Sequence, residues 1–118
     1  MLSNPPYGKS WKTDAEKMGG KKDILDTRFN TYLSDTTEIQ MLPKTSDGQL
    51  LFLLNNISKM KKDTELGSRI AEVHNASSLF SGDAGSGESN ARRFMFENDL
   101  VEAIIALPES MFYNTSLG

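Results

Sequence analysis

The longest apolar run of the chain lies in its middle, where "GQLLFLLNNISKMKK" follows a short polar turn. Its apolar residues cover more than one helical stripe, which is typical of a helix packed on a sheet. Ser46 or Asp47 provides an N-cap, and Gln49 follows Ser46 by three residues, as in a capping box. Lysines close the run, where the helix dipole favours positive charge. We therefore predict a helix over residues 47–62.

Further along, short apolar stretches alternate with polar and glycine-rich segments. Residues 68–74 alternate weakly and predict a strand, and "SGDAGSGES" after them is a glycine-rich loop. Ser89 then caps a helix over residues 89–98. The run "LVEAIIALP" predicts a strand over residues 100–107 that is buried on both faces and ends at Pro108. Strands and helices in this order indicate an α/β fold with a parallel sheet.

Residues 8–46 have no sustained apolar periodicity and are interrupted by a glycine pair and a proline. We expect a long polar excursion with a short helical turn, poorly ordered or loosely packed. Loops of this length inside a compact domain are commonly functional. Trp11 and Tyr32 within it serve either as stacking platforms for bases or as local hydrophobic anchors, and the sequence leaves both interpretations open.

The amino-acid composition excludes several kinds of functional site. The chain of 118 residues is 37% hydrophobic and has no cysteine, which excludes disulfides, thiolate zinc sites and thiol nucleophiles. Its one histidine, His74, cannot form a multi-histidine metal site, and we expect it at a strand end without catalytic work. No apolar run approaches the ~18 residues of a membrane span, and no signal-peptide pattern follows Met1. We expect a soluble, cytoplasmic protein with no metal and no membrane partner.

Charge is distributed unevenly along the chain. The formal net charge is −3, while residues 1–22 carry five lysines against two acidic residues, so they hold +3 and the remainder −6. The overall sign argues against a self-sufficient nucleic-acid binder. The positive end contains Lys9 and Lys12, and a phosphate-facing loop and a solvated lysine-rich loop both account for it.

The strongest chemical signal is "SNPPYG" at the start of the chain. Two prolines fix φ at successive positions and remove two N–H donors, which leaves a rigid edge of acceptors. The Asn4 side-chain oxygen and the Pro5 carbonyl match the two hydrogens of an exocyclic amino group. Tyr7 adds a flat face for a heteroaromatic ring, and Pro6 stiffens the turn. A flipped-out amino-bearing base fits this arrangement.

Two other interpretations compete with this one. Asn4 to Tyr7 also fits N-P-x-Y, the turn that phosphotyrosine-binding domains take up, so the alternative is a non-catalytic interaction module presenting an NPxY-type turn. That mode requires a disordered tail, whereas a foldable α/β unit follows here. The stretch from Asp83 to Gly87 imitates a D-x-x-x-G-x-G cofactor loop, but no buried apolar strand leads directly into it. We interpret it as a loop that enters a helix.

The motif "NPPY" is similar to motif IV of the amino-methyltransferases, written N/D/S-P-P-Y/F/W, which methylate adenine N6 or cytosine N4 in DNA. The rest of the chain resembles the modification subunit of type I restriction–modification systems. In that family a strand, a glycine-containing loop, a helix ending in "END", a strand ending in "LP" and then "MFYNT" follow motif IV in this order. The resemblance covers nearly the whole chain.

This resemblance implies a fold: the C-terminal half of a Rossmann-like, S-adenosylmethionine-dependent methyltransferase domain, with a partial parallel sheet and flanking helices. Residues 1–8 are then a strand end and the NPPY loop, residues 9–46 the polar excursion and residues 47–118 the α/β segment. The half with the cofactor-binding motif I would precede Met1, so we expect this fragment alone to be inactive.

Half a sheet has open edges, which has consequences for association. Without the strand that separates them in the family, the strands at 68–74 and 100–107 either pair directly or recruit the edge of a second copy. The 47–62 helix also loses neighbours on its apolar face. We therefore expect self-association through sheet edges or that helix.

The resemblance also implies a reaction, the transfer of a methyl group from S-adenosylmethionine to the N6 of a flipped adenine in double-stranded DNA. A specificity subunit would read the sequence and a restriction subunit would cut. The turn alone suits adenine N6 and cytosine N4 equally. Asn4 would also touch the cofactor at its edge. The residues expected to act on the base are Asn4, Pro5, Pro6 and Tyr7, and those expected to contact DNA are Lys9, Lys12, Asn114 and Thr115.

Overall fold

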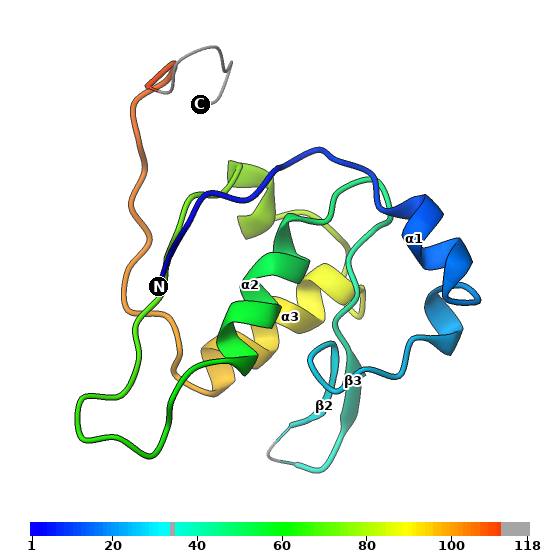
Figure 1. Cartoon of the computed structure of the whole chain (residues 1–118), viewed down its shortest axis with the longest axis horizontal. Coiled ribbons are helices and arrows are strands. Elements are labelled where there is room, and N and C mark those ends of the chain that lie inside the picture. The colour runs from blue at the N-terminus through cyan, green and yellow to red at the C-terminus, as the bar shows by residue number, and fades with distance from the viewer. Residues whose placement is uncertain (34, 112–118) are drawn as a thin grey trace.

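The computed structural model describes residues 1–33 and 35–111, with two helices at its centre and two small sheets around them (Figure 1). The helices are α1 (Lys12–Lys17), α2 (Gln49–Ser58) and α3 (Gly87–Glu97), with short 3-10 helices η1 (Lys21–Asp23) and η2 (Ala76–Leu79). The strands are β1 (Leu2–Ser3), β2 (Asn30–Tyr32), β3 (Glu38–Gln40) and β4 (Ala71–Glu72). Within the described ranges, no helix is long and apolar enough to cross a bilayer.

The start of the chain pairs with a strand that lies about seventy residues later. β1 runs parallel to β4, with Leu2 opposite Ala71 and Ser3 opposite Glu72. Ala71 N–H donates to the Met1 carbonyl at 2.9 Å. This pair confirms the predicted partial parallel sheet, and the strand predicted over residues 68–74 is present in a shorter form.

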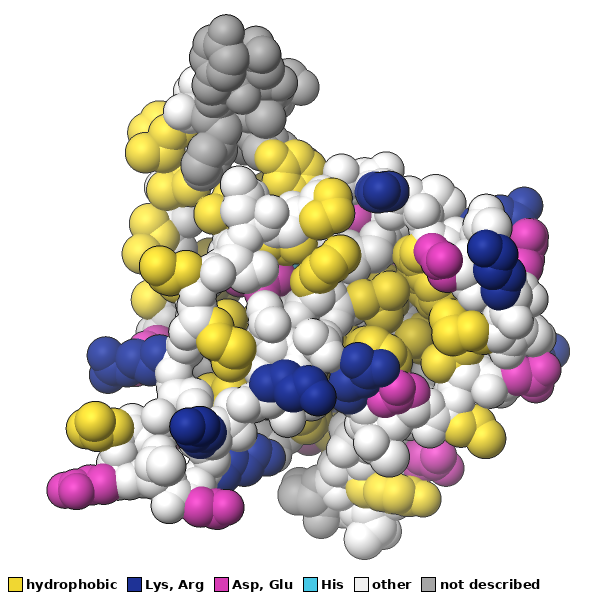
Figure 2. Space-filling view, in the orientation of Figure 1, with side chains coloured by type: hydrophobic (Ala, Val, Ile, Leu, Met, Phe, Trp, Pro, Cys, Tyr) yellow, Lys and Arg dark blue, Asp and Glu magenta, His cyan; other side chains and the backbone are white. Residues whose placement is uncertain are grey.

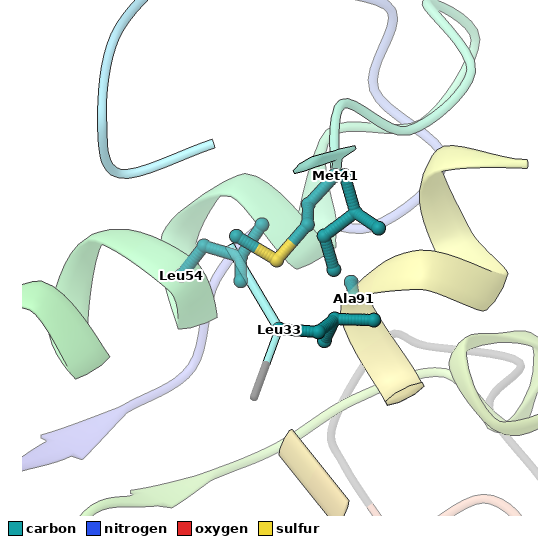
Figure 3. Close-up of a cluster of buried hydrophobic side chains, with 5 residues drawn as sticks. Leu33, Met41, Leu54 and Ala91 are labelled. Carbon is teal, nitrogen blue, oxygen red and sulfur yellow. The ribbon is translucent and has the colours of Figure 1, made fainter. Parts of the chain in front are cut away.

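The main hydrophobic cluster joins the β2–β3 hairpin to both central helices (Figure 3). The hairpin is antiparallel, with Thr31 opposite Ile39. Buried side chains from the hairpin region meet one residue of α2 and one of α3, and Phe29 and Phe94 pack around them. The members of this cluster are Leu33, Ile39, Met41, Leu54 and Ala91.

A second cluster lies beside α1, and it shows that the expectation of a loosely packed segment over residues 8–46 is wrong. Its members are Trp11, Ala15, Ile24 and Leu42, with Phe29 and Leu51 packed against them. The buried apolar residues of this segment lie in or within two residues of helices and strands that are six residues long or shorter. Such elements are too short to show a helical or strand period, so the sequence reads as polar although its sparse apolar side chains are buried.

Both central helices confirm the prediction but differ at their ends. α2 begins at Gln49 and ends at Ser58, inside the predicted range 47–62, and its N-cap is Gly48 and not Ser46 or Asp47. α3 begins at Gly87, and its cap is Ser86 and not Ser89, because the Ser86 side chain accepts a hydrogen bond from the Ser89 N–H at 3.2 Å. An N-cap oxygen accepts from an N–H group two or three residues further on, in the first turn, and Ser86 stands at that distance from Ser89.

The strand predicted over residues 100–107 is wrong. These residues are extended but belong to no strand in the described part of the chain, and Ile104 and Ile105 are 57% and 78% exposed. Direct pairing with residues 68–74, one of the two alternatives, is absent from the described residues, where the sheet holds β1 and β4 alone. Apolar, β-branched composition favours a strand, but a strand forms only where a neighbour supplies the other half of the ladder. Figure 2 shows hydrophobic side chains gathered on the surface along this edge of the molecule.

Gly87 allows a close backbone contact that a side chain would prevent. A Cβ atom at this position would lie 1.6 Å from the Leu42 carbonyl oxygen and 2.4 Å from its carbon. We expect Gly87→Ala to lower the free energy of unfolding by about 3 kcal/mol or more, because the backbone of residue 42 must move. Urea unfolding followed by Trp11 fluorescence measures this.

Arg93→Ala on the exposed side of the same helix is the control. It removes ion pairs whose partners are well exposed, so we expect a change within about 1 kcal/mol. Equal midpoints for Gly87→Ala and wild type would contradict the close contact.

Candidate functional site

The NPPY motif follows directly on β1, at the carboxyl end of the parallel strand pair. Val73 N–H donates to the Ser3 carbonyl at 3.0 Å, which is the last bond between the two strands before Asn4. In open α/β sheets, ligands bind outside the carboxyl ends of the strands. The structure therefore places the motif at the edge where such sheets bind ligands.

Within the motif, exposed and buried residues alternate. Asn4 and Pro6 are exposed, Pro5 is buried, and Tyr7 is half-buried. Among the hydrogen bonds of the described residues, none involves the Asn4 side chain. Buried Pro5 thus fixes the turn to the body of the protein, while the Asn4 amide projects into solvent as a free acceptor.

The end of the loop is tied to the start of α2. Gly8 has a φ of +69°, a conformation that glycine adopts readily, and its N–H donates to Asp47 Oδ1 at 3.1 Å. The next carbonyl, that of Lys9, accepts from the Gly48 N–H at 3.2 Å. In Figure 1 the N-terminal segment accordingly passes over the end at which α2 begins.

Trp11 is a hydrophobic anchor in this structure, which decides between the two interpretations of that residue. Its side chain is 8% exposed, and its Nε1–H donates to the Lys44 carbonyl at 2.9 Å. Its backbone N–H donates to the Thr45 carbonyl at 2.8 Å. Tyr32, in contrast, is 66% exposed on β2 and is not an anchor.

Of the four candidate DNA contacts, two lie among the described residues. Lys9 and Lys12 are exposed near the end of the loop, and Lys12 Nζ lies 3.9 Å from a carboxylate oxygen of Glu16 one helical turn on. Asn114 and Thr115 lie outside the described residues. Lys9 follows Tyr7 by two residues and Lys12 opens α1, so both lysines are exposed on the segment that leaves the NPPY motif.

The glycine-rich loop before α3 serves packing and does not form a cofactor cradle. Gly87 contacts the backbone of Leu42, and the buried Glu88 carboxylate accepts from the Lys44 N–H at 2.8 Å. The small cavity next to it has about 20 Å³, room for one water molecule but not for a nucleoside. Residues lining it include Asp47, Gln49 and Glu88. The residues at this loop do not fit S-adenosylmethionine.

Sequence reasoning missed two polar residues that support the loop. It treated Asp47 only as a helix cap and Gln49 only as a capping-box partner of Ser46. In the structure Gln49 is 3% exposed, and its Nε2 donates to Asp47 Oδ2 at 3.0 Å. A glutamine inside the first turn of a mostly apolar helix was the available signal, because a buried amide needs fixed partners.

Other charged residues have structural partners. Arg92 is half-buried and donates to the carbonyls of Ser78 and Ser81 at 3.1 and 2.6 Å, whereas Arg93 is exposed. His74 Nε2 lies 2.9 Å from a carboxylate oxygen of Glu72, two residues earlier at the end of β4.

The shifted pKa values belong to the turn before β2 and to the β2–β3 hairpin. The Arg28 side chain bonds to Asp26 and lowers the pKa of that carboxyl to about 2. Hydrogen bonds from Thr37 likewise lower the pKa of Asp35. Among the described residues, no cluster of three acidic or histidine side chains is placed to hold a metal ion.

Comparison with known proteins gives one match. The family model described as "N-6 DNA Methylase" matches residues 1–118, the whole of the sequence. Nothing among the curated proteins and nothing among the solved structures matches the chain.

The anchoring role of Trp11 leads to a stability prediction. Trp11→Phe leaves the Lys44 carbonyl without its donor and opens space beside Leu42, so we expect the free energy of unfolding to fall by about 1–3 kcal/mol. Urea unfolding followed by circular dichroism measures it. Tyr32→Phe is the matched control, because that ring is largely exposed, and unchanged stability in both variants would contradict the anchor.

Proposed function

The chain belongs to the N-6 DNA methylase family, and from this premise we propose that it forms the target-base side of a DNA adenine-N6 methyltransferase. The proposed reaction moves a methyl group from S-adenosylmethionine to the N6 of an adenine flipped out of double-stranded DNA. The proposed setting is a type I restriction–modification complex. The observation that supports this most directly is the rigid Asn4–Tyr7 turn, with Asn4 exposed at the carboxyl end of a parallel strand.

We propose that two acceptors of this turn bind the reacting amino group. The N6 lone pair of adenine is delocalised into the ring, so the nitrogen is a weak nucleophile. The Asn4 side-chain oxygen and the Pro5 carbonyl each accept one N6 hydrogen. Both bonds strengthen as positive charge builds on the nitrogen during methyl transfer, which is electrostatic stabilisation by a preorganised site.

Tyr7 is proposed to hold the flipped base by stacking. An extruded base gives up its neighbours in the duplex, and an aromatic face replaces part of that stacking, typically with about 1–3 kcal/mol per base. Tyr7 is half-buried, so it is not closed off from solvent. Pro6 limits the freedom of the turn between the two recognition elements.

S-adenosylmethionine would supply the methyl group, and Asn4 is the residue of this chain that we propose to reach its edge. Methyltransferases of the N-6 DNA methylase family generally use this cofactor. The water-sized cavity beside Gln49 and the glycine loop before α3 do not fit it. We therefore assign to this chain the positioning of the base and no further part in cofactor binding.

The charge of the chain supports a role for partners in DNA binding. With a net charge of −3, the chain neutralises few phosphates by itself, although Lys9 and Lys12 are exposed next to the loop. We propose that a specificity subunit contributes sequence recognition and much of the affinity, and that a restriction subunit completes the complex. The interaction-module alternative is disfavoured by the bonds that tie Gly8 and Lys9 to α2, because an NPxY ligand needs a free extended tail.

The acceptor role of Asn4 gives the decisive test. In the holoenzyme assembled with its specificity subunit, we expect Asn4→Ala to lower methyl transfer to unmodified DNA about a hundredfold or more, with S-adenosylmethionine binding retained. Incorporation of labelled methyl groups and calorimetry measure the two quantities. Asn98→Ala, an exposed asparagine at the end of α3, is the control. Activity of Asn4→Ala close to wild type would refute the assignment.

The stacking role of Tyr7 is tested by a pair of substitutions. Tyr7→Phe keeps the ring, so we expect activity within about threefold of wild type, whereas Tyr7→Ala should weaken capture of the base about tenfold or more. The same labelled-methyl assay, run over a range of DNA concentrations, measures both. A defect in Tyr7→Phe as large as that of Tyr7→Ala would show that the hydroxyl, and not the ring face, is needed.

A further inference from the structure

A single carboxylate links the end of the NPPY loop to the beginning of α2. Asp47 Oδ1 accepts from the backbone N–H groups of Gly8 and Gln49, both at 3.1 Å. Gly8 follows Tyr7 directly in the chain. The position at which the chain leaves the proposed base-binding turn is thus set by a helix terminus.

A buried amide in turn holds this carboxylate. The Gln49 side chain is 3% exposed, and its Nε2 donates to Asp47 Oδ2 at 3.0 Å and to Ser77 Oγ at 3.2 Å. Its Oε1 accepts from the Asn75 N–H at 3.0 Å. Because every polar atom of a buried amide is costly to leave unpaired, this arrangement resists rearrangement. It connects the loop through α2 to the residues that follow β4.

The chain beyond Gly8 is held along the same surface. The Gly48 N–H donates to the Lys9 carbonyl at 3.2 Å, and the Trp11 N–H donates to the Thr45 carbonyl at 2.8 Å. At its other end the loop is continuous with β1, which is paired to β4. The four residues of the NPPY motif therefore span two fixed points, and Asp47 supplies the fixed point nearest to Tyr7.

We propose that Asp47 and Gln49 are positioning residues for base capture, an inference that rests on the proposed function of the loop. They act through Gly8 on the placement of Tyr7 and of the Asn4 and Pro5 acceptors. A displacement of about 1 Å in such a constellation costs on the order of a hundredfold in rate. Loss of the bond to Gly8 should therefore lower kcat for methyl transfer.

Two substitutions of Asp47 separate its bond to Gly8 from its bonds to Gln49. Asp47→Asn keeps an oxygen that accepts from both N–H groups, but its NH2 group faces the Gln49 Nε2 donor, so it removes only the bond to the Gln49 side chain. Asp47→Ser keeps a hydroxyl that accepts locally from the Gln49 N–H, as serine does in such turns, but it is too short to reach Gly8. Ser86→Ala is the matched control, since it removes the cap of α3, which has no bond to the loop.

The experiment uses the holoenzyme and measures kcat and KM for unmodified DNA, calorimetric binding of S-adenosylmethionine, and amide hydrogen exchange at Gly8. We expect Asp47→Ser to lower kcat about tenfold or more and to speed Gly8 exchange, with cofactor affinity within about twofold of wild type. Asp47→Asn, which keeps the bond to Gly8 but loses the one to the Gln49 side chain, should have a kcat between that of Asp47→Ser and wild type, and Ser86→Ala should stay within about twofold of wild type.

Two outcomes overturn the inference: wild-type kcat in Asp47→Ser, or an equal loss of kcat in Ser86→Ala. The result for Asn4→Ala distinguishes this from failure of the proposed function. An inactive Asn4→Ala variant beside a fully active Asp47→Ser variant removes only the positioning role. A fully active Asn4→Ala variant removes both proposals.

Discussion

The structure depends on two adjacent residues that face opposite ways. Met41 and Leu42 are each 1% exposed and follow directly on β3. Met41 joins the cluster between the hairpin and the helices, and Leu42 joins the cluster around Trp11. This short stretch therefore unites two small cores that would each be too small to be stable alone.

The parts of the fold that the sequence predicted well are those with long, strongly patterned elements. The α2 run is apolar over more than two turns, and α3 has a capping serine and apolar positions at helical spacing. The strand prediction over residues 100–107 was wrong, since their composition is that of a strand but no described segment pairs with them. Composition reports what a segment tolerates, whereas the ladder depends on a neighbour far away in the chain.

In the candidate site, too, the sequence predicted one part and missed another. The NPPY motif could be recognised because proline and asparagine restrict the backbone and define the acceptors by themselves. Its support could not, because Asp47 and Gln49 act through residues 39 and 26 positions away, Gly8 and Asn75. The hydrogen bonds from Arg92 to the carbonyls of Ser78 and Ser81 could not be predicted for the same reason. Local chemistry is visible in a sequence, and the network that holds it in place is not.

The contact between Gly87 and Leu42 bears on how glycine-rich loops are interpreted in general. Spacing of glycines before a helix is commonly taken as a sign of nucleotide binding, because glycine lets a phosphate approach the backbone. Here the space a side chain would fill is occupied by a peptide carbonyl of the same chain. Gly87 therefore serves a contact within the protein and leaves no space for a ligand at that position. The atom that faces the missing Cβ, more than the spacing of the glycines, distinguishes a binding loop from a loop that packs against its own chain.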